Sequence, residues 1–138
     1  MELKVKFSIL PETFAICRLD REAPVPDWAA GDSLSSITRT AEELSIVCPQ
    51  TRVPEEIKRN DGWRCLKIEG ILDFSLTGVI ANLTRPLGNE GISVLVISTY
   101  NTEYLLLKEQ HLEKAITVLA HSGHGFQRET GGNHPNSY

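Results

Sequence analysis

The sequence predicts an α+β protein in which helices cover one face of antiparallel sheets. Three observations predict this class: short segments in which apolar and polar residues alternate, two segments with apolar residues at helical spacing, and turn residues between them. With 138 residues, the chain is long enough for one compact domain or for two small lobes. Its composition, 41% hydrophobic and 23% charged, is that of an ordinary globular protein, which argues against general disorder.

The first half of the chain is expected to form four short strands and little helix. The strands are residues 3–9, 14–19, 34–40 and 44–48. Pro24 and Pro26 interrupt the segment between the second and third strands, so at most a short helix over 27–30 fits there. The polar stretch 49–62 is the expected join between two lobes.

The second half is expected to form three strands and two amphipathic helices. The strands are residues 63–72, 92–99 and 104–107. Apolar residues at helical spacing predict a helix over 77–88, with Thr77 as its N-cap. Pro86 lies inside this pattern and is expected to kink the helix or to tighten its last turn. A second helix is predicted over 110–122.

The two halves resemble each other when the sequence is shifted by sixty residues. Residues 36–50 then align with 96–110 without a gap. The identical pairs include Ile37 with Ile97, Glu43 with Glu103, and Gln50 with Gln110. Together with the order of the elements, this favours two divergent copies of one β-α-β-β-α unit, the first with a shortened helix.

This order of elements indicates two ferredoxin-like (βαββαβ) lobes. We predict a degenerate N-terminal lobe over 1–62, a second lobe over 63–122, and a flexible tail over 123–138 that is ordered at most near Phe126. The second lobe lacks its last strand in this prediction. The edge strand 3–9 could fill that place and lock the lobes together.

The composition excludes several classes of function. A net charge of −4 and the absence of a Lys/Arg cluster argue against nucleic-acid binding. No apolar run is long enough for a membrane span or a signal peptide, so we expect a cytoplasmic protein. The three cysteines, Cys17, Cys48 and Cys65, form no C-x-x-C pair and are expected to be packed in the core.

Catalytic and metal-binding motifs are also missing from the sequence. It contains no G-x-S-x-G, H-E-x-x-H, P-loop or dinucleotide fingerprint, so we expect no enzyme activity and no cofactor. His121 and His124 have a spacing that metal sites use. The end of a helix favours a cation, however, and explains His121 without a metal.

The string GILDFSLTGVIANLTRPLGNEGISVLVISTYNTEYLLLKEQHLEKAI, which begins at residue 70, resembles an ACT domain. With SITRTAEELSIVC upstream, it is similar to tandem ACT proteins related to the CASTOR arginine sensors and to aspartate-kinase regulatory lobes. The resemblance implies a regulatory sensor that binds a small molecule, expected to be a free amino acid. It also implies a homodimer and a regulated protein partner. The alternative is an interaction or dimerisation module of the same fold with no ligand.

The helix start at residue 77 suits an amino acid as ligand. Its unpaired backbone N–H groups lie at the positive end of the helix dipole and can hold a carboxylate. Asp73 can accept hydrogen bonds from the ammonium, and the strand after residue 91 can supply an apolar wall. The predicted ligand-binding residues are Asp73, Ser75, Leu76, Thr77, Gly78, Val79, Ile80, Gly91, Ile92, Ser93 and Val94.

Overall fold

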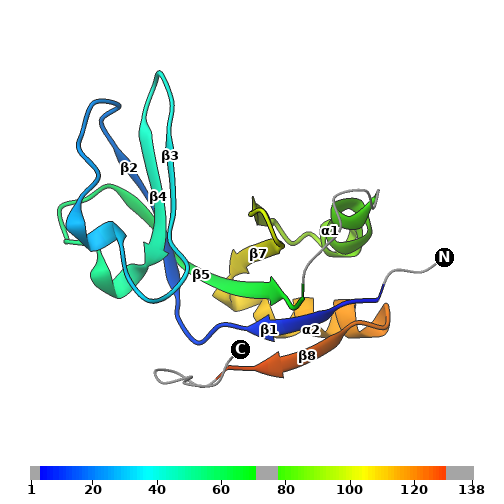
Figure 1. Cartoon of the computed structure of the whole chain (residues 1–138). Helices are drawn as coiled ribbons and strands as arrows, with labels where there is room; N and C mark the ends of the chain where they lie inside the picture. Colours follow the sequence, from blue (N-terminus) through cyan, green and yellow to red (C-terminus); the bar gives the residue numbers. More distant parts are fainter. Residues whose placement is uncertain (1–3, 71–77, 130–138) are drawn as a thin grey trace. The chain divides into compact units, whose positions relative to one another are not determined.

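The computed structural model describes residues 4–70 and 78–129, and Figure 1 shows their arrangement. The chain divides into two compact units. Unit 1 consists of Met1–Pro11 and Arg64–Tyr138, and unit 2 is the contiguous segment Glu12–Trp63. Both units contain antiparallel strands, and the described α-helices belong to unit 1, so the α+β class is confirmed.

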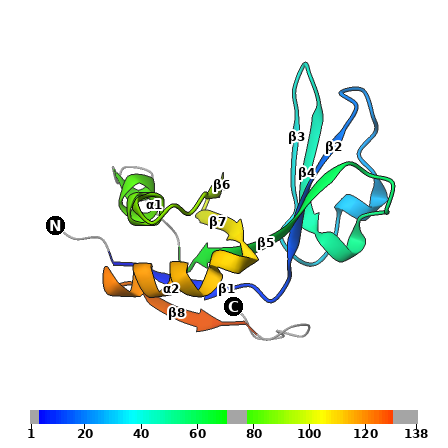
Figure 2. The same ribbon diagram turned by 180° about the vertical axis from the view of Figure 1, so that it is seen from behind.

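Unit 1 consists of a sheet with two α-helices. Its elements are β1 (Lys6–Ile9), the end of β5 (Arg59–Ile68), α1 (Val79–Asn89), β6 (Leu95–Ser98), β7 (Glu103–Lys108), η3 (Glu109–His111), α2 (Leu112–His121) and β8 (Gly125–Arg128). The strands follow the order β8-β1-β5-β7-β6. Phe7 of β1 lies opposite Ile68 of the antiparallel strand β5 and opposite Phe126 of the parallel strand β8. Figure 2 shows β1 and β8 side by side.

Both helices of unit 1 pack on the same face of this sheet. Alternate strand residues meet the apolar stripes of the helices in one core. Its buried members are Phe7, Ile9, Leu66, Ile68, Leu83, Leu87, Ile92, Leu105, Leu107, Leu112, Ala115 and Leu119. Burial of each large side chain in this core contributes about 1.5–3 kcal/mol. The expectation that helices cover one sheet face is therefore confirmed for this unit.

Helix α1 continues through Pro86 and ends at Asn89. Proline has no N–H, so the carbonyl of Asn82 loses its donor within the helix. Asn82 is exposed, and water can therefore replace that donor. The proline consequently does not end the helix.

Unit 2 has the strands of the expected first lobe without its α-helices. Its elements are β2 (Phe14–Leu19), η1 (Asp27–Ala29), β3 (Ser36–Arg39), β4 (Leu44–Pro49), η2 (Gln50–Arg52) and the beginning of β5. Every residue of unit 2 is described, and its helical segments are the two 3₁₀ turns η1 and η2. The expected βαββαβ lobe is therefore not formed here. Pro24 and Pro26 explain the missing first helix.

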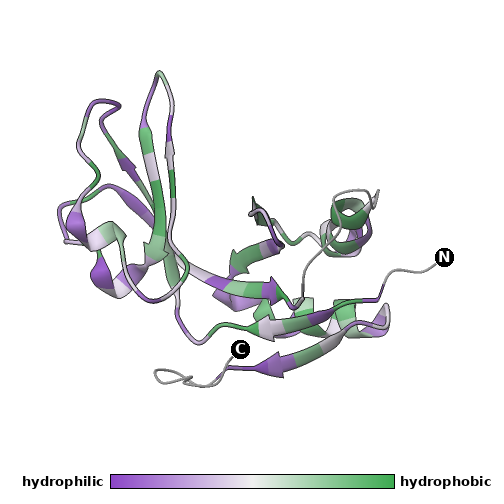
Figure 3. Cartoon of the chain, in the orientation of Figure 1, coloured by the Kyte–Doolittle hydropathy of each residue, from purple (hydrophilic) through white to green (hydrophobic). Residues whose placement is uncertain are grey.

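The core of unit 2 is covered by loops instead of helices. Apolar residues of β2 and β4, visible along β4 in Figure 3, pack with Ala29 and Val53. Arginines hold the covering loops through backbone carbonyls: Arg39 donates to Ala23 at 2.7 Å, Arg52 to Trp28 at 3.2 Å, and Arg59 to Val53 at 2.9 Å. A planar guanidinium with several donors suits this role because it can satisfy more than one carbonyl.

The two hairpins of the structure repeat at an offset of 59 residues. β3, β4 and η2 begin at residues 36, 44 and 50, whereas β6, β7 and η3 begin at 95, 103 and 109. Thr40 is thereby equivalent to Thr99. The N–H of Thr40 donates to the Glu43 carbonyl at 2.9 Å, and the N–H of Thr99 donates to that of Thr102 at 2.8 Å. The expected offset of sixty is wrong by one residue.

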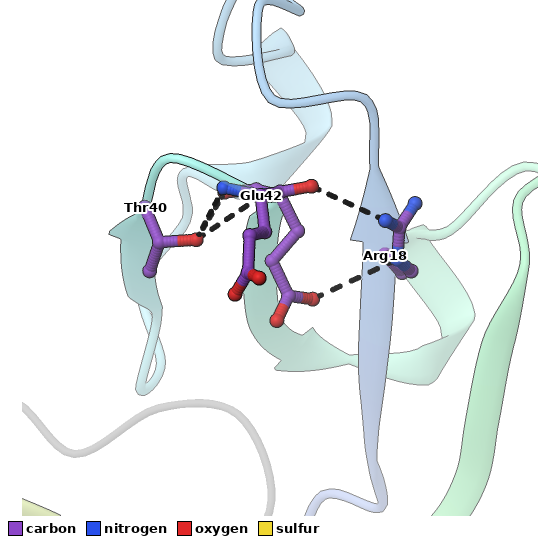
Figure 4. Close-up of polar contacts among 4 residues, drawn as sticks. Arg18, Thr40 and Glu42 are labelled. Carbon is purple, nitrogen blue, oxygen red and sulfur yellow. Dashed lines mark hydrogen bonds and ion pairs between the residues drawn. The ribbon is translucent and has the colours of Figure 1, made fainter.

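The hydroxyl of each threonine completes its turn in the same way. Thr40 Oγ1 accepts from the N–H of Glu43 at 3.1 Å, and Thr99 Oγ1 accepts from the N–H of Thr102 at 3.2 Å. In unit 2, Arg18 of β2 also donates to the carbonyl of Glu42 at 3.2 Å, as Figure 4 shows. These contacts make each turn a rigid end of its hairpin.

Both ends of the chain differ from the expectation. The N-terminal strand lies between β5 and β8 and belongs to unit 1. It thus joins the sheet of the second lobe, as the sequence allowed, but as an interior strand and not as part of a first lobe over 1–62. Strand β8 lies within the range expected to be a flexible tail, where Phe126 stacks on Phe7 with ring centroids 5.2 Å apart. The second lobe was expected to lack its last strand, but β8 supplies an additional strand there. The boundary between the two units falls after Trp63.

Candidate functional site

The start of α1 presents an open backbone surface. Gly78 precedes the helix with a left-handed φ of 74°, and an added Cβ there would meet no atom within 4 Å. The N–H of Asn82 donates to the Gly78 carbonyl at 2.9 Å, the first backbone bond between described residues at this helix start. The N–H groups of Val79 and Ile80 therefore have no carbonyl partner within α1. A ligand can approach this backbone closely because Gly78 is exposed and has no side chain.

The electrostatics of α1 also favour an anion at its start. The helix is described over its full length and has no acidic residue in its first turn. The partial positive charge of the helix N-terminus is therefore not neutralised by a side chain of α1 itself. A carboxylate placed there could accept hydrogen bonds from the N–H groups of Val79 and Ile80. It would also neutralise the partial positive charge of the helix N-terminus.

The second group of predicted site residues lies beyond the other end of α1. Gly91 has a left-handed φ of 76°, and Ile92 is 3% exposed and belongs to the core of unit 1. Ser93 is exposed and Val94 is half-buried. All four precede β6, which begins at Leu95 and not at residue 92 as expected. Ile92 is thus a core residue whose N–H donates to the Leu87 carbonyl at 3.0 Å, and it is not open to a ligand.

The length of α1 separates these two groups. Eleven helical residues lie between Gly78 and Glu90, and at 1.5 Å per residue they span roughly 16 Å. The carboxylate and ammonium of a free amino acid are only a few bonds apart. One such ligand cannot contact Gly78 and Gly91 of the same chain at once. The remaining predicted residues, Asp73, Ser75, Leu76 and Thr77, lie outside the described residues.

Thr102 fixes the strand that leads toward the candidate site. It is 6% exposed, and its Oγ1 donates to the carbonyl of Ile68, the last residue of β5, at 2.9 Å. This bond ties the β6–β7 turn to the end of β5. Thr102 was not among the predicted site residues, and it lies between the predicted strands 92–99 and 104–107.

The buried thiols and the described histidines do not form a reactive centre. Burial, together with the neighbouring Cys48, raises the pKa of Cys17 to about 11. Within residues 4–70 and 78–129, no three His, Cys, Asp or Glu side chains are grouped as metal ligands. Among these residues, no helix is long and apolar enough to cross a membrane.

Unit 1 is thus an α+β unit with two helices on one face of its sheet and an exposed residue, Gly78, at the start of the first helix. The family model of the ACT domain matches residues 58–121, and a second model, for an N-terminal domain, matches residues 12–56. A protein from Agobacterium tumefaciens is 37% identical, with 96% of this chain and 98% of that chain covered and a TM-score of 0.89. The chain therefore belongs to the same family as that protein, and its residues 58–121 match the ACT-domain model.

More distant structures share the fold. The aspartokinase alpha and beta subunits are 18% identical over 87% of this chain and 98% of that chain, with a TM-score of 0.62. The ligand-free regulatory subunit of aspartate kinase from Thermus thermophilus is 10% identical over 85% and 96%, with a TM-score of 0.59. A search of curated proteins found no match.

Proposed function

We propose that this protein is a non-catalytic regulatory protein that binds a free amino acid at the start of α1. The observation that carries the proposal is the exposed, left-handed Gly78 followed by the N–H groups of Val79 and Ile80, which have no carbonyl partner within α1. The ACT domain and the fold shared with aspartate-kinase regulatory subunits support the same role. Asp73 is the proposed acceptor for the ammonium. The more specific relationship to arginine sensors stays a prediction.

The separation of the two predicted groups supports a homodimer. Gly91, Ser93 and Val94 can meet a ligand held at Gly78 only if they come from a second copy, because α1 keeps the groups apart within one chain. Strand β6 could form the contact between copies. Among the described residues it pairs with β7 alone, and Leu95, Val96 and Ile97 are half-buried and uncharged. Exposed sheet edges of this kind are usually covered.

Each chain is expected to carry one such site. The alternative, a second site in unit 2, would need an equivalent helix start. Residues 12–63 contain no α-helix, and the segment that would supply one is held by Arg39 and Arg52. We therefore expect one bound amino acid per chain.

A thermal-shift screen with the standard free amino acids tests the proposal. A ligand that binds only the native state stabilises it by about 2.7 kcal/mol at a concentration one hundred times its Kd. We expect one or a few amino acids to raise the melting temperature. Calorimetry should then give one ligand per chain. A flat response to every amino acid, with no small molecule released from the purified protein, would remove the sensor proposal.

The second candidate is an interaction module without a ligand. The uncharged, half-buried edge β6 is the observation that favours it, because a strand from another protein could extend the sheet there. The two candidates differ in the amino-acid screen. The module predicts no stabilisation by any amino acid but retains dimerisation through β6.

A further inference from the structure

Strand β8 is fastened to the beginning of β1 by a buried histidine. His124 is 6% exposed, and its Nδ1 accepts a hydrogen bond from the backbone N–H of Val5 at 3.1 Å. Its ring meets Phe7 edge to face, with centroids 5.8 Å apart and an interplanar angle of 78°. Only an imidazole without a proton on Nδ1 can accept this bond. The contact therefore requires neutral His124.

The charged groups around His124 oppose its protonation. Lys4, which precedes β1, donates its Nζ to the carbonyl of Ser122 at 2.9 Å, beside the histidine. Burial lowers the pKa of His124, and the charge of Lys4 lowers it further. Lys6 of β1 lies near Gly125 on the other side of the β1–β8 pair. It is a further cation in this region.

The acidic group that faces β8 from α2 is already paired elsewhere. Glu113 accepts from Arg128 at 2.8 Å, at the opposite end of both elements from His124. His121 at the end of α2 is exposed. Within the described residues, no carboxylate acts on the pKa of His124. Nothing there compensates a charged imidazole.

We propose that His124 is a pH-sensitive latch, which holds β8 on β1 when neutral and releases it when protonated. Protonation would place an N–H of the imidazole against the N–H of Val5 and would add a positive charge beside Lys4. The adjoining backbone bonds, from Gly125 N–H to the Val5 carbonyl and from Glu129 N–H to the Ile9 carbonyl, are both 3.0 Å long. Release of β8 breaks them and frees the outer edge of β1 for another strand.

The size of the effect follows from proton linkage. Once β8 opens, His124 regains its ordinary pKa of 6.5, whereas in the closed state the pKa is lower. Protons therefore bind preferentially to the open state, and opening increases as the pH falls below about 6.5. Between pH 7.5 and 5.5, the opening constant is expected to rise by as much as about tenfold, the limit in which the closed state stays neutral.

Amide hydrogen exchange of residues 124–129 in the whole chain, corrected for the intrinsic rate at each pH, measures this opening. We expect this rise for the natural protein and no rise for His124→Asn, whose amide oxygen can replace Nδ1 as acceptor without titrating. The matched control, His121→Asn, removes an exposed histidine three residues away and should retain the full pH dependence.

Three results would overturn the latch. The first is a natural protein whose opening is no more pH-dependent than that of His124→Asn. The second is a loss of pH dependence in His121→Asn. The third needs no variant: an NMR titration of the natural protein in which the His124 imidazole has a pKa of 6.5 or above. This last measurement decides the question even if His124→Asn does not fold.

Discussion

Thr102 donates its hydroxyl to the carbonyl of Ile68 across 34 residues of sequence, and the bond is buried. Replacing Thr102 with valine keeps the shape of the side chain but leaves this carbonyl without its donor. A buried, unsatisfied carbonyl costs about 1–3 kcal/mol, so Thr102→Val should lower the free energy of unfolding by that amount. Urea denaturation measures it.

Thr117→Val is the matched control for that substitution. Thr117 also donates to a carbonyl, that of Glu113 at 3.0 Å, but it is exposed on α2. Water can replace the lost donor there, and the cost should stay within about 0.5 kcal/mol. Equal effects of the two substitutions would contradict a structural role for Thr102.

The carboxylate of Asp73 is predicted to hold the ammonium of the ligand. A charge-assisted hydrogen bond contributes about 1.5–3 kcal/mol, so Asp73→Ala should weaken amino-acid binding roughly ten- to hundredfold in calorimetry. Asp20→Ala is the control, because Asp20 is exposed, caps the N–H of Glu22 at 3.1 Å, and belongs to the unit without an α-helix. Negligible effects of both substitutions would favour the interaction module.

A lysine in β6 should break the proposed dimer. Ile97→Lys places a charge on the uncharged edge, where two copies would bring like charges together. Thr38→Lys makes the same change at the equivalent position of β3, which is 59 residues earlier and exposed. Sedimentation should show a dimer for the natural protein and Thr38→Lys, and a monomer for Ile97→Lys. A dimer that tolerates Ile97→Lys must use another surface.

The raised pKa of Cys17 predicts slow chemical modification. With a pKa of about 11, roughly a thousandth of this thiol is ionised at pH 8, and only the thiolate is nucleophilic. Alkylation of native Cys17 should therefore be at least about a hundredfold slower than that of the unfolded chain. Mass spectrometry after timed iodoacetamide treatment measures both rates. Rapid labelling of the native protein would show that the core opens readily.

The raised pKa of Cys17 also predicts the direction in which the free energy of unfolding changes with pH. The pKa of the Cys17 thiol is 9.0 when unperturbed and about 11 in the folded protein, so the folded state disfavours the thiolate. This contribution to the free energy of unfolding is fully present below about pH 9. It should fall as the pH rises from 9 toward 11. Cys17→Ala removes the slope and serves as its control.

Local patterns predicted both hairpins correctly. β3 with β4, and β6 with β7, each combine strand-forming residues with a turn that one threonine closes. Identical residues, however, favoured an offset of sixty residues between the two hairpins. The equivalent backbone hydrogen bonds of Thr40 and Thr99 show that the offset is 59. Side chains alternate between sheet faces, so a shift of one residue exchanges the buried and exposed sets. Sequence identity alone could not fix that register.

Strand β8 could not be predicted from its own residues. Gly125–Arg128 contains one apolar side chain, Phe126, whose stacking partner Phe7 is near the other end of the chain. The candidate site shows a similar limit. Local signals predicted the helix start with Thr77 as N-cap, whereas the observed N-cap is Gly78, one residue later. The separation of Gly78 from Gly91 depends on the full length of α1.

The position of β1 has a consequence for folding during synthesis. Unit 2 is contiguous in sequence and can form its contacts as soon as residues 12–63 have left the ribosome. β1 is made earlier, but both of its neighbours come later: β5 ends at Ile68, and β8 ends at Arg128. Contacts over such separations form slowly because the loop entropy is lost first. The first strand to be synthesised is therefore among the last to acquire both of its neighbours.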